Sequence, residues 1–158
     1  MDSLQTLPLT HSWPVLEQGH HFHLGLVHGC DTAALSGLAR PPLDPEKLAR
    51  LGVGLWECDL RDDSLVWSDE VYDIFALPRG SAVSRAAAVA LYRPESRAAM
   101  ERLRAYAVKH CRGFTLDAEL QPVGRRRRWM RLMAAPVCVD GRAVRLHGVK
   151  QDVTRDYV

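Results

Sequence analysis

The sequence has no apolar run of the roughly 20 residues that a membrane-spanning helix needs. Its opening stretch, MDSLQTLPLT, contains neither the basic segment nor the apolar segment of a secretory signal peptide. The net charge is only +2, which is too small to indicate a polyanionic partner by itself. These absences predict a soluble, cytoplasmic protein with no membrane partner.

The motifs of several large enzyme classes are also missing. There is no G-x-S-x-G nucleophile elbow, no phosphate-binding Walker loop, no H-E-x-x-H metal motif and no G-x-G-x-x-G dinucleotide fingerprint. An enzymatic interpretation therefore has little support, and we expect no catalytic residues in this chain.

Cysteine is scarce and scattered. Cys30, Cys58, Cys111 and Cys138 form no C-x-x-C pair, which argues against a zinc knuckle or a dithiol redox site. Disulfide frameworks are typical of small secreted domains that cannot build an apolar core, whereas 47% of this chain is hydrophobic. We therefore expect reduced thiols.

What the sequence does contain is a succession of short helix and strand patterns. Helical spacing and capping residues predict helices at 44–51, 69–75, 84–92 and 94–110. Alternation and strand-forming residues predict strands at 54–60, 65–68, 114–123, 128–139 and 143–153. Asp140-Gly141 is a strong hairpin signal between the last two strands. This order predicts an α+β domain with a five-stranded antiparallel sheet and helices on one face.

Several of these segments resemble the PAS domain with its C-terminal PAC portion. GLWECDL (54–60) is similar to the opening strand of that family, and VWSDEVYDIFALP (66–78) to its second strand and first helix. GVKQDVT (148–154) resembles the glycine-to-threonine motif that closes the domain. Tyr92 departs from the pattern, because the family commonly has a histidine there.

The resemblance divides the chain into three parts. Residues 1–42 are a His-rich N-terminal extension, residues 43–155 the PAS/PAC domain, and residues 156–158 the start of a linker to an effector. Because the chain ends as that linker begins, we expect the effector to lie outside this sequence.

A sensory signal-transduction module, rather than an enzyme, is what the resemblance implies. Such domains bind a small ligand or cofactor between the inner sheet face and the helices, and they commonly form homodimers through the outer sheet face and flanking helices. Their signal leaves through the segment that corresponds to Asp152, Val153 and Thr154. The effector is usually a histidine kinase of a two-component system, a cyclic-dinucleotide enzyme or a transcription factor. A ligand-free dimerisation domain is the alternative.

Eight residues are candidates for the ligand pocket: Trp56, Cys58, Trp67, Phe75, Met100, Leu103, Met133 and Lys150. Alternation places Trp56 and Cys58 on one face of their strand without showing which face is inward. The apolar candidates are more often plain core than ligand contacts. Lys150 stands where flavin photosensors of this family have a glutamine. Inside a pocket it needs an acidic ligand or an exit to solvent, and the exit is more common.

The resemblance also bears on cofactors, whose identity stays unknown. In haem-binding relatives the iron ligand generally comes from the helix that matches 94–110, where the only histidine is His110 at the end. The cysteine motif that forms a flavin adduct is missing from 69–110. Both cofactors are therefore disfavoured within the pocket, and a pocket with no cofactor is a further alternative.

The N-terminal histidines suggest a different kind of sensor. Two of the residues His20, His21, His23 and His28 could share one face of a strand or helix and bind zinc, copper or haem iron, with Cys30 completing the site. The other interpretation is a solvated arm, because their spacing matches no known metal motif.

Four consecutive arginines, Arg125 to Arg128, precede Trp129. Nucleic-acid-binding surfaces spread basic residues over a face and interleave aromatic side chains, which this run does not do. We expect the solvated tip of a hairpin, with nucleic acid or an acidic protein as less favoured partners. Glu57 and Asp59 share a strand face, but Asp59 lies before a turn that an aspartate commonly caps, so we do not expect a catalytic carboxylate pair.

Overall fold

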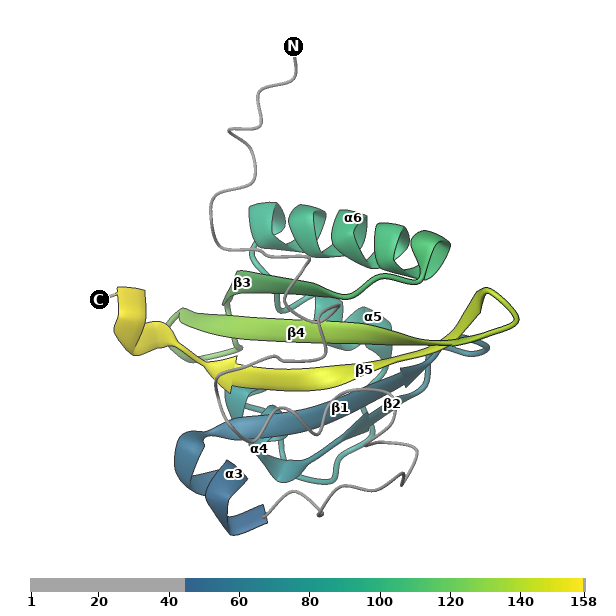
Figure 1. The fold of residues 1–158 in the computed structure, drawn as a ribbon. Coiled ribbons are helices and arrows are strands. Elements are labelled where there is room, and N and C mark those ends of the chain that lie inside the picture. Colours follow the sequence, from purple (N-terminus) through teal and green to yellow (C-terminus); the bar gives the residue numbers. More distant parts are fainter. Residues whose placement is uncertain (1–44, 158) are drawn as a thin grey trace.

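The computed structural model describes residues 45–157, which form an antiparallel sheet with helices packed against one face (Figure 1). The strands are β1 (Val53–Asp59), β2 (Leu65–Trp67), β3 (Phe114–Leu120), β4 (Arg128–Val139) and β5 (Arg142–Asp152). The helices are α3 (Pro45–Leu51), α4 (Asp69–Phe75), α5 (Arg85–Val89), α6 (Pro94–His110) and the 3₁₀ helix η3 (Thr154–Tyr157). The strand order β2-β1-β5-β4-β3 confirms the predicted α+β class.

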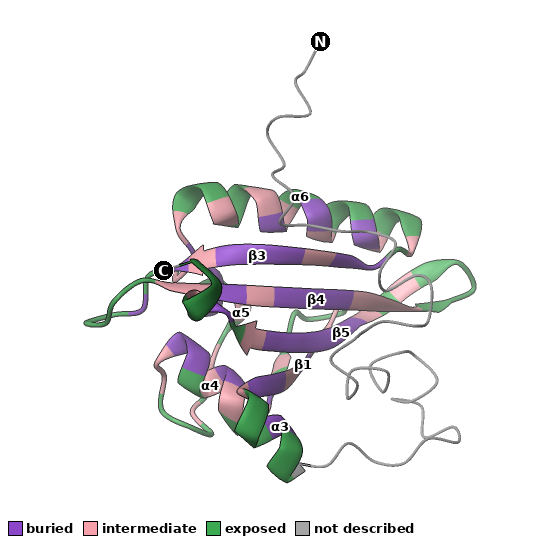
Figure 2. Cartoon of the chain, turned by 60° about the vertical axis from the view of Figure 1, so that its left-hand side comes forward, coloured by how far each residue is buried: buried purple, intermediate pink, exposed green. Residues whose placement is uncertain are grey.

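The three helices between β2 and β3 carry the chain from one edge of the sheet to the other. Each helix buries apolar residues against the inner sheet face, including Phe75 of α4, Val89 of α5 and Leu103 of α6. Figure 2 shows this burial in the strands and in the sheet-facing parts of the helices. The core therefore lies between the sheet and α4–α6.

Helix α5 is shorter than the sequence predicted, because the residues after it pair with a strand. Tyr92 forms an isolated bridge to Leu120, and the amide of Gln121 donates to the carbonyl of Leu91. The helix begins at Ser84, whose hydroxyl accepts a hydrogen bond from the amide of Ala87, as an N-cap residue does.

The Asp140-Gly141 hairpin is confirmed: both residues have positive φ, of 51° and 76°, as the tight turn between β4 and β5 requires. Arg125, Arg126 and Arg127 are exposed in the other hairpin, between β3 and β4. Arg128, the last arginine of the run, begins β4, as the strand predicted at 128–139 does, and it donates to the carbonyl oxygens of Asp73 and Ile74 at the end of α4. A helix C-terminus leaves such carbonyls without partners, which gives this arginine a structural role.

The prediction of reduced thiols is wrong for one pair, since Cys111 and Cys138 form a disulfide. Cys111 ends α6 in a left-handed conformation, and the register of β4 and β5 shifts between Val137 and Cys138. These two local features bring the Cα atoms to 6.4 Å across 27 residues of sequence, which no spacing rule reveals. Cys58 is free and buried.

A cytoplasmic location stays a prediction. None of the helices within residues 45–157 has the length and apolar character needed to span a membrane.

The glycine of the closing motif is required by close packing inside the sheet. A Cβ atom at Gly148 would lie 1.9 Å from the carbonyl oxygen of Met133 on β4. Gly148 also pairs with Trp56 on β1, and the indole nitrogen of Trp56 donates to that same carbonyl at 3.2 Å. The Trp56 ring therefore reaches across β5 to β4, which is possible only where β5 has no side chain.

We predict that Gly148→Ala lowers the free energy of unfolding by about 3 kcal/mol, because strands and indole must move apart to admit the methyl group. The matched control is Gly52→Ala, where φ is 63° but nothing lies within 4 Å of the added Cβ. In that control, the free energy of unfolding should fall by only about 1 kcal/mol, the cost of placing alanine in a left-handed conformation. Urea unfolding measures both, and equal losses would contradict the packing argument.

We expect the double substitution Cys111→Ala/Cys138→Ala to lower the free energy of unfolding by about 3 kcal/mol, because a bridge across this length of chain restricts the unfolded state. Thermal unfolding with and without a reducing agent checks it. Reduction should lower the melting temperature of the wild type and leave that of the double variant unchanged.

Candidate functional site

A cavity of about 50 Å³ lies between the inner sheet face and helices α5 and α6. Its wall is mostly apolar, with Ala88, Val89, Met100, Phe114, Leu132 and Leu146 contributed by both layers. Three cationic side chains also reach it: Lys150 from β5, Arg85 from the start of α5 and Arg104 from α6. An apolar wall with a few charged groups is the usual composition of a small-molecule site.

Five of the sequence candidates line this cavity: Trp56, Cys58, Trp67, Met100 and Lys150. The inward face of β1 is thus the one that carries Trp56 and Cys58. Phe75 is not part of the cavity wall, but the ammonium nitrogen of Lys150 lies over its ring. Leu103 is buried in the core outside the cavity wall.

Met133 is misplaced by the sequence interpretation. It pairs with Thr115 and Val149, and its neighbour Leu132 is the residue that lines the cavity. Because side chains alternate along a strand, Met133 lies on the opposite face. The sequence could have revealed this only if the inward face of β4 had been known.

Arg85, Arg104 and Tyr92 were not predicted to lie at the site. Arg85 belongs to α5 and Arg104 to α6, and Tyr92 lies between these helices and pairs with Leu120 of β3. Their positions depend on how the helices cross the sheet. Burial raises the pKa of the Tyr92 hydroxyl, so this group stays neutral.

Lys150 is the most unusual residue of the site, with only 6% of its surface exposed. Its ammonium nitrogen lies 5.0 Å from the ring centre of Trp56, 5.2 Å from that of Trp67 and 4.9 Å from that of Phe75. These three rings form an aromatic cage, whose π faces attract a cation. The expected exit to solvent is wrong, because the side chain of Lys150 lies on the inner face of the sheet and is buried there.

The ammonium group has no hydrogen bond or ion pair with any residue in 45–157. Desolvation lowers the pKa of Lys150 to about 7, the nearby Cys58 raises it, and the positive charge of Arg85 lowers it further. Near neutral pH, the group therefore changes its charge readily.

The two arginines at the cavity already have acidic partners. Arg85 forms an ion pair with Glu101, and Arg104 donates to Asp63 at 2.7 Å. Lys150 is consequently the one cation at the cavity for which the described part of the chain supplies no counter-ion.

Cys58 is not activated for nucleophilic chemistry. Burial raises the pKa of its thiol, an effect larger than the opposing one of Arg104. A neutral thiol is a poor nucleophile, and this one lies 3.8 Å from the carboxylate of Asp63.

Trp67 adds a second polar group without a partner. Its indole nitrogen is buried and makes no hydrogen bond within the described chain. The ring is fixed by stacking on Phe75, with centroids 4.9 Å apart and planes at 19°. The indole N–H is thus a rigid, buried donor without a partner among the described residues.

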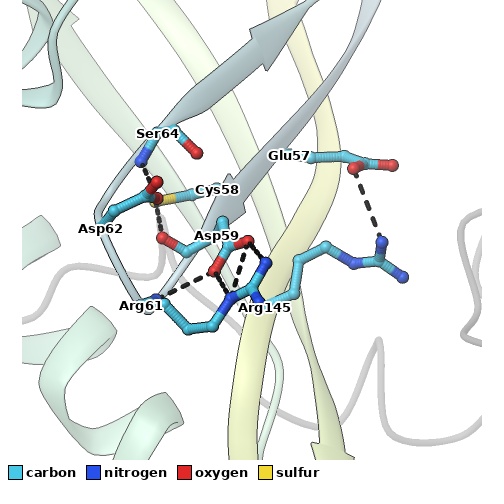
Figure 3. A network of polar contacts seen from close by, with 7 residues as sticks. All are labelled: Glu57, Cys58, Asp59, Arg61, Asp62, Ser64 and Arg145. Carbon is cyan, nitrogen blue, oxygen red and sulfur yellow. Dashed lines mark hydrogen bonds and ion pairs between the residues drawn. The ribbon is translucent and has the colours of Figure 1, made fainter.

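The two carboxylates of β1 pair with arginines, as Figure 3 shows. Asp59 accepts from the amide and guanidinium of Arg61, which hold its pKa down at about 2. Glu57 faces Arg145 across the outer sheet surface at 3.7 Å. Asp59 caps the turn as predicted.

The predicted signal exit is tied to β4 by a compact set of contacts. The carboxylate of Asp152 accepts from the amide and hydroxyl of Thr154, and the hydroxyl of Thr154 accepts from the amide of Trp129. The amide of Val153 donates to the carbonyl of Trp129 at 2.8 Å. The side chain of Val153 is buried.

Tyr157 of η3 closes these contacts. Its ring stacks on Trp129 with centroids 4.2 Å apart, and its hydroxyl donates to Asp117 at 2.5 Å. Asp117 also accepts two hydrogen bonds of 2.8 Å from Arg131. We call Asp117, Trp129, Arg131 and Tyr157 the exit clasp.

Metal binding by the N-terminal histidines is not addressed by the structure, since His20, His21, His23 and His28 lie outside residues 45–157. Within those residues, no cluster of three or more His, Cys, Asp or Glu side chains could hold a metal ion.

No known family model matches the chain, and no curated protein matches its sequence. Solved structures match its fold. An RNA-binding light-oxygen-voltage receptor gives a TM-score of 0.59 at 19% identity, covering 67% of this chain and 30% of that one. The N-terminal domain of a diguanylate cyclase with a PAS/PAC sensor from Marinobacter aquaeolei gives 0.61 at 15% identity, covering 67% and 99%.

A sensory box histidine kinase/response regulator from Burkholderia thailandensis gives a TM-score of 0.58 at 15% identity, covering 70% of this chain and 83% of that one. In the light-oxygen-voltage receptor, the matched region makes up only 30% of the chain. The chain has the PAS fold, as its sequence motifs predicted.

One of the similar structures concerns a flavin analogue in a light-oxygen-voltage domain. A flavin does not fit this site. A cavity that binds a single benzene ring measures about 150 Å³, whereas this one measures about 50 Å³. The helices above it, α4 to α6, also carry no cysteine between their first and last residues.

We predict that Lys150→Met stabilises the protein by about 2 kcal/mol below pH 7, because it removes a buried charge without a counter-ion. The unfolded lysine keeps its proton up to a pKa of 10.5, whereas the folded one loses it near 7. Wild-type stability therefore rises with pH above 7, and the advantage of the variant shrinks.

Urea unfolding of both proteins between pH 6 and 9 checks this prediction. Lys109→Met, at an exposed position of α6, is the control and should change stability by less than about 0.5 kcal/mol. A Lys150→Met protein that is less stable than wild type at every pH would show that the aromatic cage outweighs desolvation.

Proposed function

We propose that this chain is a sensory module that binds a small ligand in the cavity beside Lys150 and passes the change to an effector. The observation that carries the proposal is a buried ammonium group that lines a cavity without a counter-ion. Burying such a group costs free energy, and a structural role would be met equally well by an apolar side chain. A ligand that completes its interactions gives the lysine a use.

The position of Lys150 also supports a route for the signal. It precedes Asp152 by two residues on β5, and Asp152 starts the contacts that hold η3 to β4. A ligand that shifts Lys150 would strain β5, the strand that ends at Asp152 next to the exit clasp. The chain after the clasp would then change its direction or mobility.

We propose a histidine kinase, a cyclic-dinucleotide enzyme or a transcription factor as the effector. The support is that similar folds occur in a diguanylate cyclase with a PAS/PAC sensor and in a sensory box histidine kinase. We further propose that the module works as a homodimer, as sensor domains of this fold commonly do. Light scattering coupled to size exclusion should give twice the monomer mass of 17.7 kDa.

Two other functions remain as alternatives. The small volume of the cavity favours a ligand-free dimerisation domain, in which Lys150 has no ligand. The histidines at 20–28 support a haem or metal sensor, which an absorption spectrum and metal analysis of the purified chain would reveal. Loss of bound metal in His21→Ala or His23→Ala would favour that alternative.

The proposed binding site is tested by a thermal-shift screen of colourless metabolites against wild type and Ala88→Leu. Ala88 lines the cavity, so a larger side chain there should fill it. We expect a ligand at a hundred times its dissociation constant to stabilise the wild type by about 2.7 kcal/mol, a shift of several degrees, and to leave the variant unchanged. A dimer that no compound stabilises would favour the ligand-free alternative.

We predict that Tyr157→Phe speeds amide exchange at residues 153–157 by about three- to tenfold, because it removes the hydrogen bond to Asp117. Burial and this hydrogen bond raise the pKa of Tyr157 to about 12, so the phenol remains a donor at neutral pH. Tyr72→Phe is the control, since it removes a hydrogen bond of 3.0 Å to Ser81 elsewhere. Faster exchange at 153–157 in that control would contradict a local clasp.

A further inference from the structure

We propose that the ligand is a short-chain monocarboxylate whose carboxylate group pairs with Lys150. This inference rests on the proposed function, because it assigns a chemical class to the same cavity. Three observations carry it: the kind of polar group left unpaired, the charge at the cavity and the volume of the cavity.

The charged group left unpaired at the cavity is a donor. The ammonium of Lys150 has three N–H bonds, lines the cavity and makes no hydrogen bond or ion pair with the described residues. The neighbouring acceptors are already used, since Glu101 pairs with Arg85 and Asp63 with Arg104. The ammonium of Lys150 therefore lacks an anionic acceptor.

The charge at the cavity points to an anion. Arg85 on α5 and Arg104 on α6 are balanced by Glu101 on α6 and Asp63 in the β1–β2 hairpin. Cys58 on β1 and Tyr92 after α5 are neutral, because burial raises the pKa of both. Protonated Lys150 is thus an uncompensated positive charge, which one monoanion would neutralise.

The volume limits the ligand to a very small molecule. A buried water needs about 10–15 Å³ of such space, so about 50 Å³ accommodates three to five non-hydrogen atoms. Acetate, with four, meets this limit. An alkyl group is expected because the rest of the wall is apolar, with Val89, Met100 and Leu146 among its residues.

The same groups give a pH dependence. Desolvation lowers the pKa of Lys150 to about 7 without a ligand, and a bound carboxylate favours the charged form. Above pH 7 the ligand must therefore bind together with a proton. Affinity should fall by up to about tenfold per pH unit from 7 upward, until the pKa of the bound state is reached.

The experiment is calorimetric titration of the whole chain with acetate, acetamide and nitrate at constant ionic strength. Acetamide has the shape of acetate without its charge, and nitrate has the charge without an alkyl group. We expect acetate to bind at least about tenfold more tightly than either, which corresponds to one charge-assisted hydrogen bond in a buried site. Acetamide or nitrate binding as tightly as acetate would overturn the proposal.

The matched variants are Lys150→Met and Lys109→Met, which remove the same charge inside and outside the cavity. Lys150→Met should weaken acetate binding at least about tenfold, and Lys109→Met should leave it unchanged. Should Lys150→Met not fold, the pH series on the wild type decides. Constant affinity for acetate between pH 7 and 8.5 would show that Lys150 does not hold the anion.

The titration also separates this inference from the proposed function. Stabilisation of the wild type, but not of Ala88→Leu, by a neutral or cationic compound would refute the carboxylate and keep the sensory site. A wild type that binds neither acetate nor any other small molecule would refute both.

Discussion

The structure is organised around the buried ammonium group of Lys150. Alternation along β5 places the side chain of Lys150 on the inner sheet face, where it is buried between the sheet and the helices. The cost of burying an ammonium group is partly offset by the π faces of Trp56, Trp67 and Phe75, which come from three separate elements. Arg85 and Arg104 each form an ion pair with an acid, which reduces their repulsion of the ammonium group. The cage, the ion pairs and the cavity are therefore parts of one electrostatic arrangement.

That arrangement depends on a backbone feature two residues earlier on β5. Gly148 lets the Trp56 indole cross the strand and donate to the Met133 carbonyl. The hydrogen bond fixes the orientation of a ring that faces the lysine. A glycine that the closing motif makes recognisable in the sequence thus sets the position of a ring that lines the cavity. Packing in the sheet and the chemistry of the site are linked through this one position.

The order and type of the elements could be predicted from the sequence because local signals agree with the fold. Capping residues and the Asp140-Gly141 turn mark element ends, and alternation marks strands. The errors fall where distant parts of the chain decide. The disulfide needs the end of α6 next to a bulge in β4, and Met133 faces outward because of the register of β4. Arg85 and Arg104 reach the cavity through helix positions that no motif marks. The packing of the helices over the inner sheet face is what buries Lys150.

Signalling needs a ligand that discriminates between two arrangements of the protein, because equal affinity for both shifts no population. A caged lysine meets this condition in a direct way. In the free state its ammonium is held only by aromatic faces, whereas an anion would hold it by a charge-assisted hydrogen bond, which is stronger and has a direction. Any resulting movement acts on β5, whose last residue, Asp152, binds Thr154 at the start of η3. Only two residues of β5 separate the buried charge from the contacts of Asp152, so β5 is the connection that the proposed signalling would use.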